Sequence, residues 1–291
     1  MAQNKFQPDA ELSEICNELW KLDKNRLQPG KDYVLDLQGE TKVYKEGRED
    51  HAKDPLFARV NEDKLKKLPT FKAFIALLDN YASETGVAEE VTPEEERENR
   101  TFLDEIMKTK VMKRCHEYLC KKNLAPKDTN AFKQLLYDLW FKLYRRTRGM
   151  READSSGFEH VFVGECRGPP GGQKDVIGFH NWIQFYLEEK RGNIDYKGWI
   201  RPKGRRSPKD NADNMSQLIS IQFSWKNDVK PVGSSFIGTS PEFEVALYTV
   251  MFYAGQHGKN SIEIGDYDID IFVHKMGDKL GSSYPVSLQK A

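Results

Sequence analysis

The sequence has neither a net charge nor a long apolar run. Its 45 Lys and Arg residues balance its 45 Asp and Glu residues, which excludes the global basic field that marks many constitutive nucleic-acid-binding proteins. No segment reaches the roughly 18 consecutive apolar residues of a membrane-spanning helix, and the start of the chain lacks the apolar stretch of a signal peptide. We therefore expect no membrane partner and a cytoplasmic or nuclear location.

Cysteine is also scarce. The cysteines form no CxxC pair, and none has a histidine nearby at zinc-finger spacing; they are Cys16, Cys115, Cys120 and Cys166. Free thiols are expected, without disulfides or a structural zinc site. Cys166 lies close to a histidine motif, so a nucleophilic role is a minor alternative, but nothing around it in the sequence indicates a base that would ionise it.

The sequence does contain clear helical periodicity in its first half. Apolar residues recur there at three- and four-residue steps, as on the buried stripe of a helix. The segment Thr92-Pro93-Glu94-Glu95 is a capping box, which predicts the start of a long helical stretch through Leu119. A short strand is predicted at Tyr33 to Leu37. Further helices are predicted at residues 12–22, from about residue 70, and at residues 132–143.

Beyond a polar stretch at residues 145–156 the period becomes two. The segments 219–225 and 267–273 alternate apolar and polar residues, which predicts half-buried strands. Helices are predicted before the first of these strands, at about residues 181–190, and between the two, from Ser240 to Gly255. We therefore predict an α+β protein with a mainly helical N-terminal region, residues 8–150, and a β-rich C-terminal region, residues 151–291.

Two histidines stand out by their context. His160 lies in GFEHVFVGE, a strand-like segment in which it shares a face with Phe158 and Phe162. His180 lies in GFHNW, at the start of a predicted helix. The segment between them is rich in glycine and proline, which favours a hairpin that brings the two imidazoles together.

Two neighbouring imidazoles suit the cleavage of RNA. At one pH, one ring can accept the proton of a ribose 2′-hydroxyl while the other protonates the departing 5′-oxygen. The phosphate between them needs a fixed positive charge. Lys230, which precedes a glycine-serine turn in DVKPVGSSFIG, is a candidate for that charge. On the residues alone, a surface lysine beside an ordinary loop is the simpler interpretation.

Long blocks of the chain resemble the EndoU family of poly(U)-specific endoribonucleases. In the second half they include GFHNWIQFYLEEK, VKPVGSSFIGTSPEFEVALYT and SSYPV, and in the first half ELSEICNELW and TGVAEEVTPEE. The resemblance covers nearly the whole chain and implies that both regions form one EndoU domain. It also implies cleavage of single-stranded RNA at uridines, with lyase-type products that carry 2′,3′-cyclic phosphate and 5′-hydroxyl ends.

The resemblance assigns the catalytic roles to His160, His180 and Lys230. By analogy with the family, His180 deprotonates the 2′-hydroxyl, His160 protonates the leaving oxygen and Lys230 stabilises the transition state. The sequence itself leaves open which histidine is the base. Glu159 and Glu165 match acidic positions that flank the first histidine, where a carboxylate orients the ring or attracts a metal.

Substrate contacts are implied for three further residues. Tyr284 matches a tyrosine that stacks on the ribose or base, and Ser282 stands where many members have threonine. A serine or a threonine hydroxyl at position 282 can hydrogen-bond the uracil edge, so the serine bears on selectivity rather than on activity. Ser234 belongs to the glycine-serine segment, whose backbone N–H groups and hydroxyls can face a phosphate.

The expected partner is single-stranded RNA that contains uridine, and the expected oligomeric state is a monomer. The resemblance implies stimulation by a divalent cation, Mn²⁺ or Ca²⁺, but no ligand set such as an EF-hand loop is visible. Residues 201–209 contain five basic residues and no acidic one, which fits a solvated loop, an RNA-landing surface or a nuclear-localisation segment.

Two alternative functions stay open. One is a catalytically silent RNA-binding protein of the same fold, although the intact His160, His180 and Lys230 argue against it. The other is a metal-binding or scaffolding protein in which the N-terminal helices matter more than the sheets.

Overall fold

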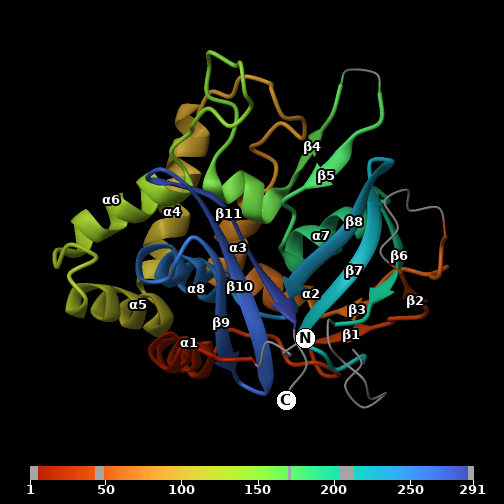
Figure 1. Cartoon of the computed structure of the whole chain (residues 1–291), viewed down its shortest axis with the longest axis horizontal. Helices are drawn as coiled ribbons and strands as arrows, with labels where there is room; N and C mark the ends of the chain where they lie inside the picture. Colours follow the sequence, from red (N-terminus) through yellow and green to blue (C-terminus); the bar gives the residue numbers. More distant parts are fainter. Residues whose placement is uncertain (1–5, 43–48, 170–171, 203–212, 288–291) are drawn as a thin grey trace, which may run out of the picture.

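The computed structural model describes residues 6–42, 49–169, 172–202 and 213–287, and it has the predicted α+β architecture (Figure 1). Helices dominate the N-terminal region and strands the C-terminal region. The N-terminal helices are α1 Ala10–Leu22, α2 Glu62–Lys67, α3 Pro69–Ala76, α4 Pro93–Met107, α5 Lys110–Lys121 and α6 Thr129–Trp140. No helix in the described part of the chain has both the length and the apolar character needed to span a bilayer.

The N-terminal region is only partly helical. The predicted strand is present as β1 (Tyr33–Leu35), and it pairs antiparallel with β3 (Phe57–Val60). A further short strand, β2 (Glu40–Thr41), pairs parallel with a strand of the C-terminal region. The two regions therefore share a sheet.

The helical stretch predicted from Thr92 to Leu119 is two helices. The capping box is formed as predicted, because the Thr92 side chain accepts from the backbone N–H of Glu95 and the Glu95 carboxylate accepts from that of Thr92. However, α4 ends at Met107, and Thr109 caps α5 by accepting from the backbone N–H of Met112 at 3.2 Å. A threonine side chain favours such an N-cap over a helix interior, which explains the break.

The larger sheet has six strands in the order β2-β6-β7-β8-β5-β4. The β7–β8 and β4–β5 pairs are antiparallel, whereas β5 runs parallel to β8. The strand predicted at 219–225 is present as β7, but the prediction that it is half-buried was wrong, because every residue of β7 is buried. The strands are β4 Glu165–Arg167, β5 Asp175–Ile177, β6 Ile194–Ile200, β7 Leu218–Trp225 and β8 Asp228–Phe236.

The smaller sheet is an antiparallel meander of β9 (Gly258–Ile264), β10 (Tyr267–Met276) and β11 (Lys279–Ser287). Along β10, Ile269, Ile271 and Val273 are buried in the core, as the alternating pattern predicts, but Asp268 and Asp270 on the other face are buried as well, so the prediction that this strand is half-buried was wrong. Figure 1 shows this sheet beside the larger one, with β11 and β8 in contact.

Two helices accompany the strands of the C-terminal region. Helix α8 (Pro241–Ala254) begins after Ser240, whose hydroxyl accepts from the backbone N–H of Phe243, and it ends before Gly255. Helix α7 (Trp182–Lys190) begins after Asn181. Both helices occur where the sequence predicted them.

The N-terminal helices pack directly on the C-terminal elements. The indole N–H of Trp140 in α6 donates to the Thr249 hydroxyl in α8 at 3.0 Å, and both side chains are buried. In the same way Cys115 of α5 contacts the carbonyl of Ala246. One continuous apolar core runs through both regions.

Candidate active site

A cleft of about 850 Å³ opens between the larger sheet and the β10–β11 hairpin. The larger sheet contributes Lys230 and Ser234, and the hairpin contributes Ser282 and Tyr284. His160 and His180 reach the cleft from the segments that flank the β4–β5 hairpin. The structure thus brings the predicted catalytic and substrate-binding residues to one cavity, although they are far apart in the chain.

The strand predicted around His160 is wrong, because residues Glu159–Val163 form a π-helical turn. Ser156 and Glu159 start this turn reciprocally: the Ser156 hydroxyl accepts from the backbone N–H of Glu159, and the Glu159 carboxylate accepts from that of Ser156. This pair resembles a capping box, a local signal for a helical turn that the apolar alternation of the segment obscures.

The predicted hairpin between the two histidines is confirmed. Strands β4 and β5 pair antiparallel, and beyond them the backbone N–H of Phe179 donates to the carbonyl of His160 at 3.1 Å. The contact requires Gly178, since a Cβ atom at this position would lie only 1.8 Å from that carbonyl oxygen. The close approach of the two segments brings His160 and His180 to the same cleft.

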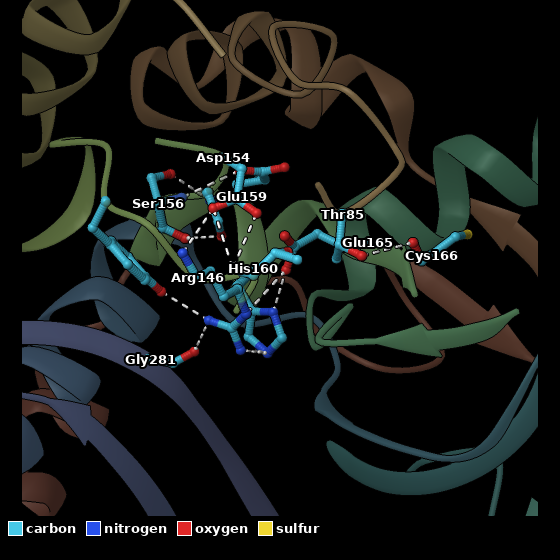
Figure 2. Close-up of polar contacts among 12 residues, drawn as sticks. Thr85, Arg146, Asp154, Ser156, Glu159, His160, Glu165, Cys166 and Gly281 are labelled. Carbon is cyan, nitrogen blue, oxygen red and sulfur yellow. Dashed lines mark hydrogen bonds and ion pairs between the residues drawn. The ribbon is translucent and has the colours of Figure 1, made fainter. Parts of the chain in front are cut away.

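The ring of His160 is held at both nitrogens (Figure 2). Its Nδ1 contacts the Glu165 carboxylate in a short hydrogen bond, and its Nε2 lies 2.9 Å from Nη2 of Arg146. A guanidinium can only donate, so Nε2 accepts and the ring proton is on Nδ1, directed at Glu165. Burial and the Arg146 cation lower the pKa of His160 well below its usual value. His160 is therefore neutral at pH 7 in the free protein.

Glu165 and Glu159 play different parts. Glu165 is fully buried and orients His160, and burial raises the pKa of its carboxyl to about 7 while Arg146 opposes that shift. Glu159 makes its polar contact with the backbone of Ser156 instead of with His160. Burial raises the pKa of Glu159 to about 11, and nearby Glu165 and Glu89 add to the shift, so this side chain is protonated at neutral pH.

His180 is fixed in the same tautomer as His160. Its Nδ1 lies 3.0 Å from the backbone carbonyl of Ser234, which can only accept, so Nδ1 carries the proton. In the neutral ring, Nε2 then has a free lone pair. Burial, reinforced by the Lys230 charge, lowers the pKa of His180 well below its usual value. The ring also stacks on Tyr284 at a centroid distance of 4.6 Å.

Lys230 is neither a surface residue nor next to a turn. It lies within β8, the Gly233-Ser234-Ser235 segment continues the same strand, and the turn before it is at Lys226-Asn227. Only 7% of Lys230 is exposed. Burial, with a contribution from the Arg167 cation, lowers the pKa of its ammonium group to about 7. The interpretation as a surface lysine beside a loop is thus wrong.

All four cysteines are free, as predicted. Cys166 is buried in β4, and burial raises the pKa of its thiol to about 12. A thiol of this kind stays protonated at neutral pH, which excludes the alternative of a cysteine nucleophile.

The described residues contain no group of three or more His, Cys, Asp and Glu side chains that fits a metal ion. The cations Arg146, Arg167 and Lys230 line the cleft instead, an environment that does not fit a resident divalent cation. Of the basic stretch 201–209, residues 203–209 lie outside the described residues. Arg201 lies at the cleft and pairs with Glu40 at 2.6 Å.

The model of the family described as endoribonuclease XendoU matches residues 11–285 of this chain. This chain belongs to the XendoU family of endoribonucleases. The EndoU resemblance identified from the sequence motifs is therefore confirmed, and so is the classification as an enzyme of this type.

Several relatives support the assignment to the XendoU family. The poly(U)-specific endoribonuclease-A of Xenopus laevis is 51% identical over 293 residues, which cover 99% of this chain and 97% of that protein. The uridylate-specific endoribonuclease B of Danio rerio is 50% identical and covers 97% of both chains. The solved structure of XendoU, described as a splicing-independent snoRNA-processing endoribonuclease, superposes with a TM-score of 0.83 at 49% identity over 97% of this chain and 99% of that one.

Arg146 is the residue of this XendoU-family site that the sequence analysis missed. Its guanidinium donates to the Gly281 carbonyl at 2.6 Å and to the Tyr144 hydroxyl at 2.8 Å, and its Nε lies 3.6 Å from Glu165 (Figure 2). These contacts aim it across His160 into the cleft. In the sequence it belongs to RRTRG, whose arginines look equivalent and were interpreted as part of a polar boundary. Three arginines in five residues were the available signal.

Proposed function

We propose that this chain cleaves single-stranded RNA at uridines by attack of the ribose 2′-hydroxyl on the adjacent phosphate. The products are a 2′,3′-cyclic phosphate and a 5′-hydroxyl. The observation that carries this proposal is the convergence of two buried histidines, each with its proton on Nδ1, and a buried lysine on one cleft. The preference for uridine follows from family membership and from the poly(U)-specific and uridylate-specific names of the relatives.

His180 acts as the general base in this mechanism. Its Nδ1 proton is committed to the Ser234 carbonyl, so Nε2 is the free acceptor in the cleft. The lowered pKa keeps this nitrogen unprotonated at neutral pH. A positioned, unprotonated imidazole can take the 2′-hydroxyl proton as the oxygen attacks phosphorus.

His160 acts as the general acid, which requires a proton on Nε2. In the free protein Arg146 occupies that nitrogen as a donor. An entering phosphate is a better partner for the guanidinium, because two parallel N–H groups can bind two of its oxygens. Once Arg146 turns to the phosphate, Nε2 can take up a proton, and the Glu165 carboxylate stabilises the resulting imidazolium through Nδ1. This proton then passes to the departing 5′-oxygen.

Lys230 supplies positive charge where the phosphate becomes more negative. Its pKa of about 7 means that the ammonium group is only partly formed in the free protein. A bound phosphate favours the charged form, so the charge increases as the substrate enters. A fixed cation at the pentacoordinate phosphorus is the electrostatic contribution that such a reaction needs.

Tyr284, Ser282 and Ser234 form the substrate-binding part of the proposal. Tyr284 stacks on His180 and lines the cleft, where its ring would contact the uridine, and the Ser282 hydroxyl would contact the polar edge of the base. Ser234 lies on β8, two residues along the cleft face from Val232 and four from Lys230.

Mn²⁺ or Ca²⁺ takes no part in the chemical step of this mechanism. A stimulatory cation would bind acidic side chains or the RNA itself, away from the reacting phosphate. A monomer contains every residue that this mechanism uses.

The experiment that tests the function is cleavage of an RNA oligomer with one uridine by wild type and by His160→Ala, with and without Mn²⁺ or Ca²⁺, followed by end-group analysis. We expect cyclic phosphate ends from wild type and a loss of activity in the variant. Ends with 3′-hydroxyl and 5′-phosphate would replace this mechanism with water attack at a metal centre. RNA binding without cleavage under every condition would support the silent RNA-binding alternative.

A further inference from the structure

Aromatic side chains line the β10–β11 side of the cleft. Phe272 and His274 alternate along β10 on the face opposite the buried isoleucines, and Tyr284 is the cross-strand partner of Phe272 on β11. A sheet face that looks into a wet cleft usually carries polar residues. Here Phe272 is half-buried and His274 exposed, and neither belongs to the apolar core of the described residues.

The three rings are nearly parallel to one another. The Phe272 and Tyr284 centroids lie 5.5 Å apart with an interplanar angle of 10°. His274 lies 6.5 Å from Phe272 at 19° and 5.9 Å from Tyr284 at 28°. We call these three residues the aromatic wall. Because Tyr284 itself stacks on His180, the wall begins at the catalytic centre and extends away from it along β10.

We propose that Phe272 and His274 form a second base site, which binds the base of the nucleotide next to the cleaved uridine. This inference rests on the proposed function, in which Tyr284 receives the uridine. Phe272 and His274 are the rings beside Tyr284, so a base linked to the uridine through one phosphate reaches them first. Parallel aromatic rings favour stacking, which every base can provide, over sequence readout, so the site takes any of the four bases.

The charges of the cleft favour nucleic acid as the occupant of this wall. The cations Arg146, Arg167 and Lys230 line the same cavity as the rings and can contact phosphates there. A single strand presents phosphates and flat bases side by side, and proteins that bind it combine a cationic groove with aromatic platforms in this way. The same arrangement explains how a protein without net charge can hold RNA.

The test uses trinucleotides in which a single ribo-uridine lies between deoxynucleotides, so that only one bond can be cleaved. In two matched substrates an abasic residue replaces the base on the 5′ side or on the 3′ side. For wild type we expect kcat/KM to fall about tenfold when the base that occupies the second site is removed, and the side that shows the loss identifies the neighbour. In Phe272→Ala, kcat/KM for the full substrate divided by kcat/KM for the abasic substrate should approach one.

Two further variants make the result decisive. Phe272→Leu keeps the apolar volume without the flat ring, so its kcat/KM ratio should also approach one. This variant keeps the test valid if Phe272→Ala folds poorly. Val232→Ala removes an exposed apolar side chain from β8 within the same cleft and should keep the wild-type ratio. If neither abasic substrate shows a lower kcat/KM, or if both Phe272 variants keep the wild-type kcat/KM ratio, the second base site is wrong and the proposed function stands. If wild type fails to cleave the full trinucleotide, the proposed function itself is wrong.

Discussion

At the scale of single residues, the site is built from groups whose protonation is controlled by their neighbours. Both rings carry their proton on Nδ1: the Arg146 guanidinium donates to Nε2 of His160, whereas the Ser234 carbonyl accepts from Nδ1 of His180 and leaves its Nε2 as a free acceptor. The two rings are chemically identical in the sequence. Their partners make one ready to accept a proton and make the other dependent on the substrate to become a donor.

Replacement of Arg146 by alanine should show both its proposed contribution to catalysis and its effect on the pKa of His160. We expect kcat/KM to fall about 100-fold, since a positioned donor to the developing charge is lost. The pKa of His160 in the free protein should rise, because the Arg146 cation contributes to its depression. The measurements are cleavage kinetics and an NMR titration of the His160 ring. Arg148→Ala, at an exposed position in the same segment, is the matched control and should leave both quantities close to wild type.

Lys230 predicts a pH dependence of its own. Burial lowers its pKa to about 7, so wild type loses the ammonium charge between pH 6 and pH 8, whereas an arginine at this position stays charged. The ratio of kcat/KM for wild type over Lys230→Arg should therefore fall about tenfold over this interval, as expected for one titrating group. Taking the ratio cancels the two histidines, which titrate in both proteins. A ratio that does not change with pH would show that Lys230 keeps its charge throughout.

At the scale of elements, the start of helix α7 positions His180, one of the proposed catalytic residues. His180 immediately precedes Asn181, whose side chain accepts from the backbone N–H groups of Ile183 and Gln184 and so caps α7. On the other side, the amide of Asn181 donates to the buried Glu244. The cap therefore ties the start of α7, and with it His180, to helix α8.

Removal of two helix caps should distinguish stability from function. Thr92→Ala and Asn181→Ala each delete an N-cap, and each should lower the free energy of unfolding by about 1 kcal/mol. Only Asn181→Ala should also lower kcat, because it alone frees the backbone that carries His180. Denaturant titration and cleavage assays of both variants provide the comparison. Equal kcat values in the two variants would mean that α7 positions His180 without its cap.

At the scale of the whole molecule, the two sequence regions form one packed body. Trp20 of α1 packs edge-on against Phe243 of α8 at a centroid distance of 5.4 Å, and Trp140 of α6 is buried against the same helix. The cleft is lined by the C-terminal region and by Arg146 of the N-terminal region, and the N-terminal helices pack on α8. We therefore expect residues 8–150 and 151–291 to unfold as one unit.

A fragment of residues 151–291 tests this expectation. Expressed alone, it should lack a cooperative thermal transition and bind a hydrophobic dye, because the apolar faces that contact α1, α5 and α6 are exposed. Co-expression with residues 1–150 is the control and should restore both the transition and RNA cleavage. A cooperative transition in the isolated fragment would show instead that the C-terminal region is an independent domain.

The sequence by itself determined most of the local structure and the family of the protein. Helix starts at Thr92 and Ser240 and the period-two strand at Tyr267 depend on neighbouring residues, so their signals can be seen without the fold. The family motifs around His160, His180 and Lys230 are contiguous in the chain, and they therefore led to the XendoU family. The π-helical turn at His160 was missed because its apolar alternation also fits a strand.

Only the tertiary structure decided how these residues work. The burial that lowers the pKa of Lys230, the choice of Arg146 among neighbouring arginines, and the two histidine tautomers all depend on atoms that meet across the cleft. The aromatic wall likewise requires β10 and β11 to pair in one register. Local sequence patterns determine which element forms, whereas desolvation and hydrogen bonding between distant segments are set only when the chain has folded.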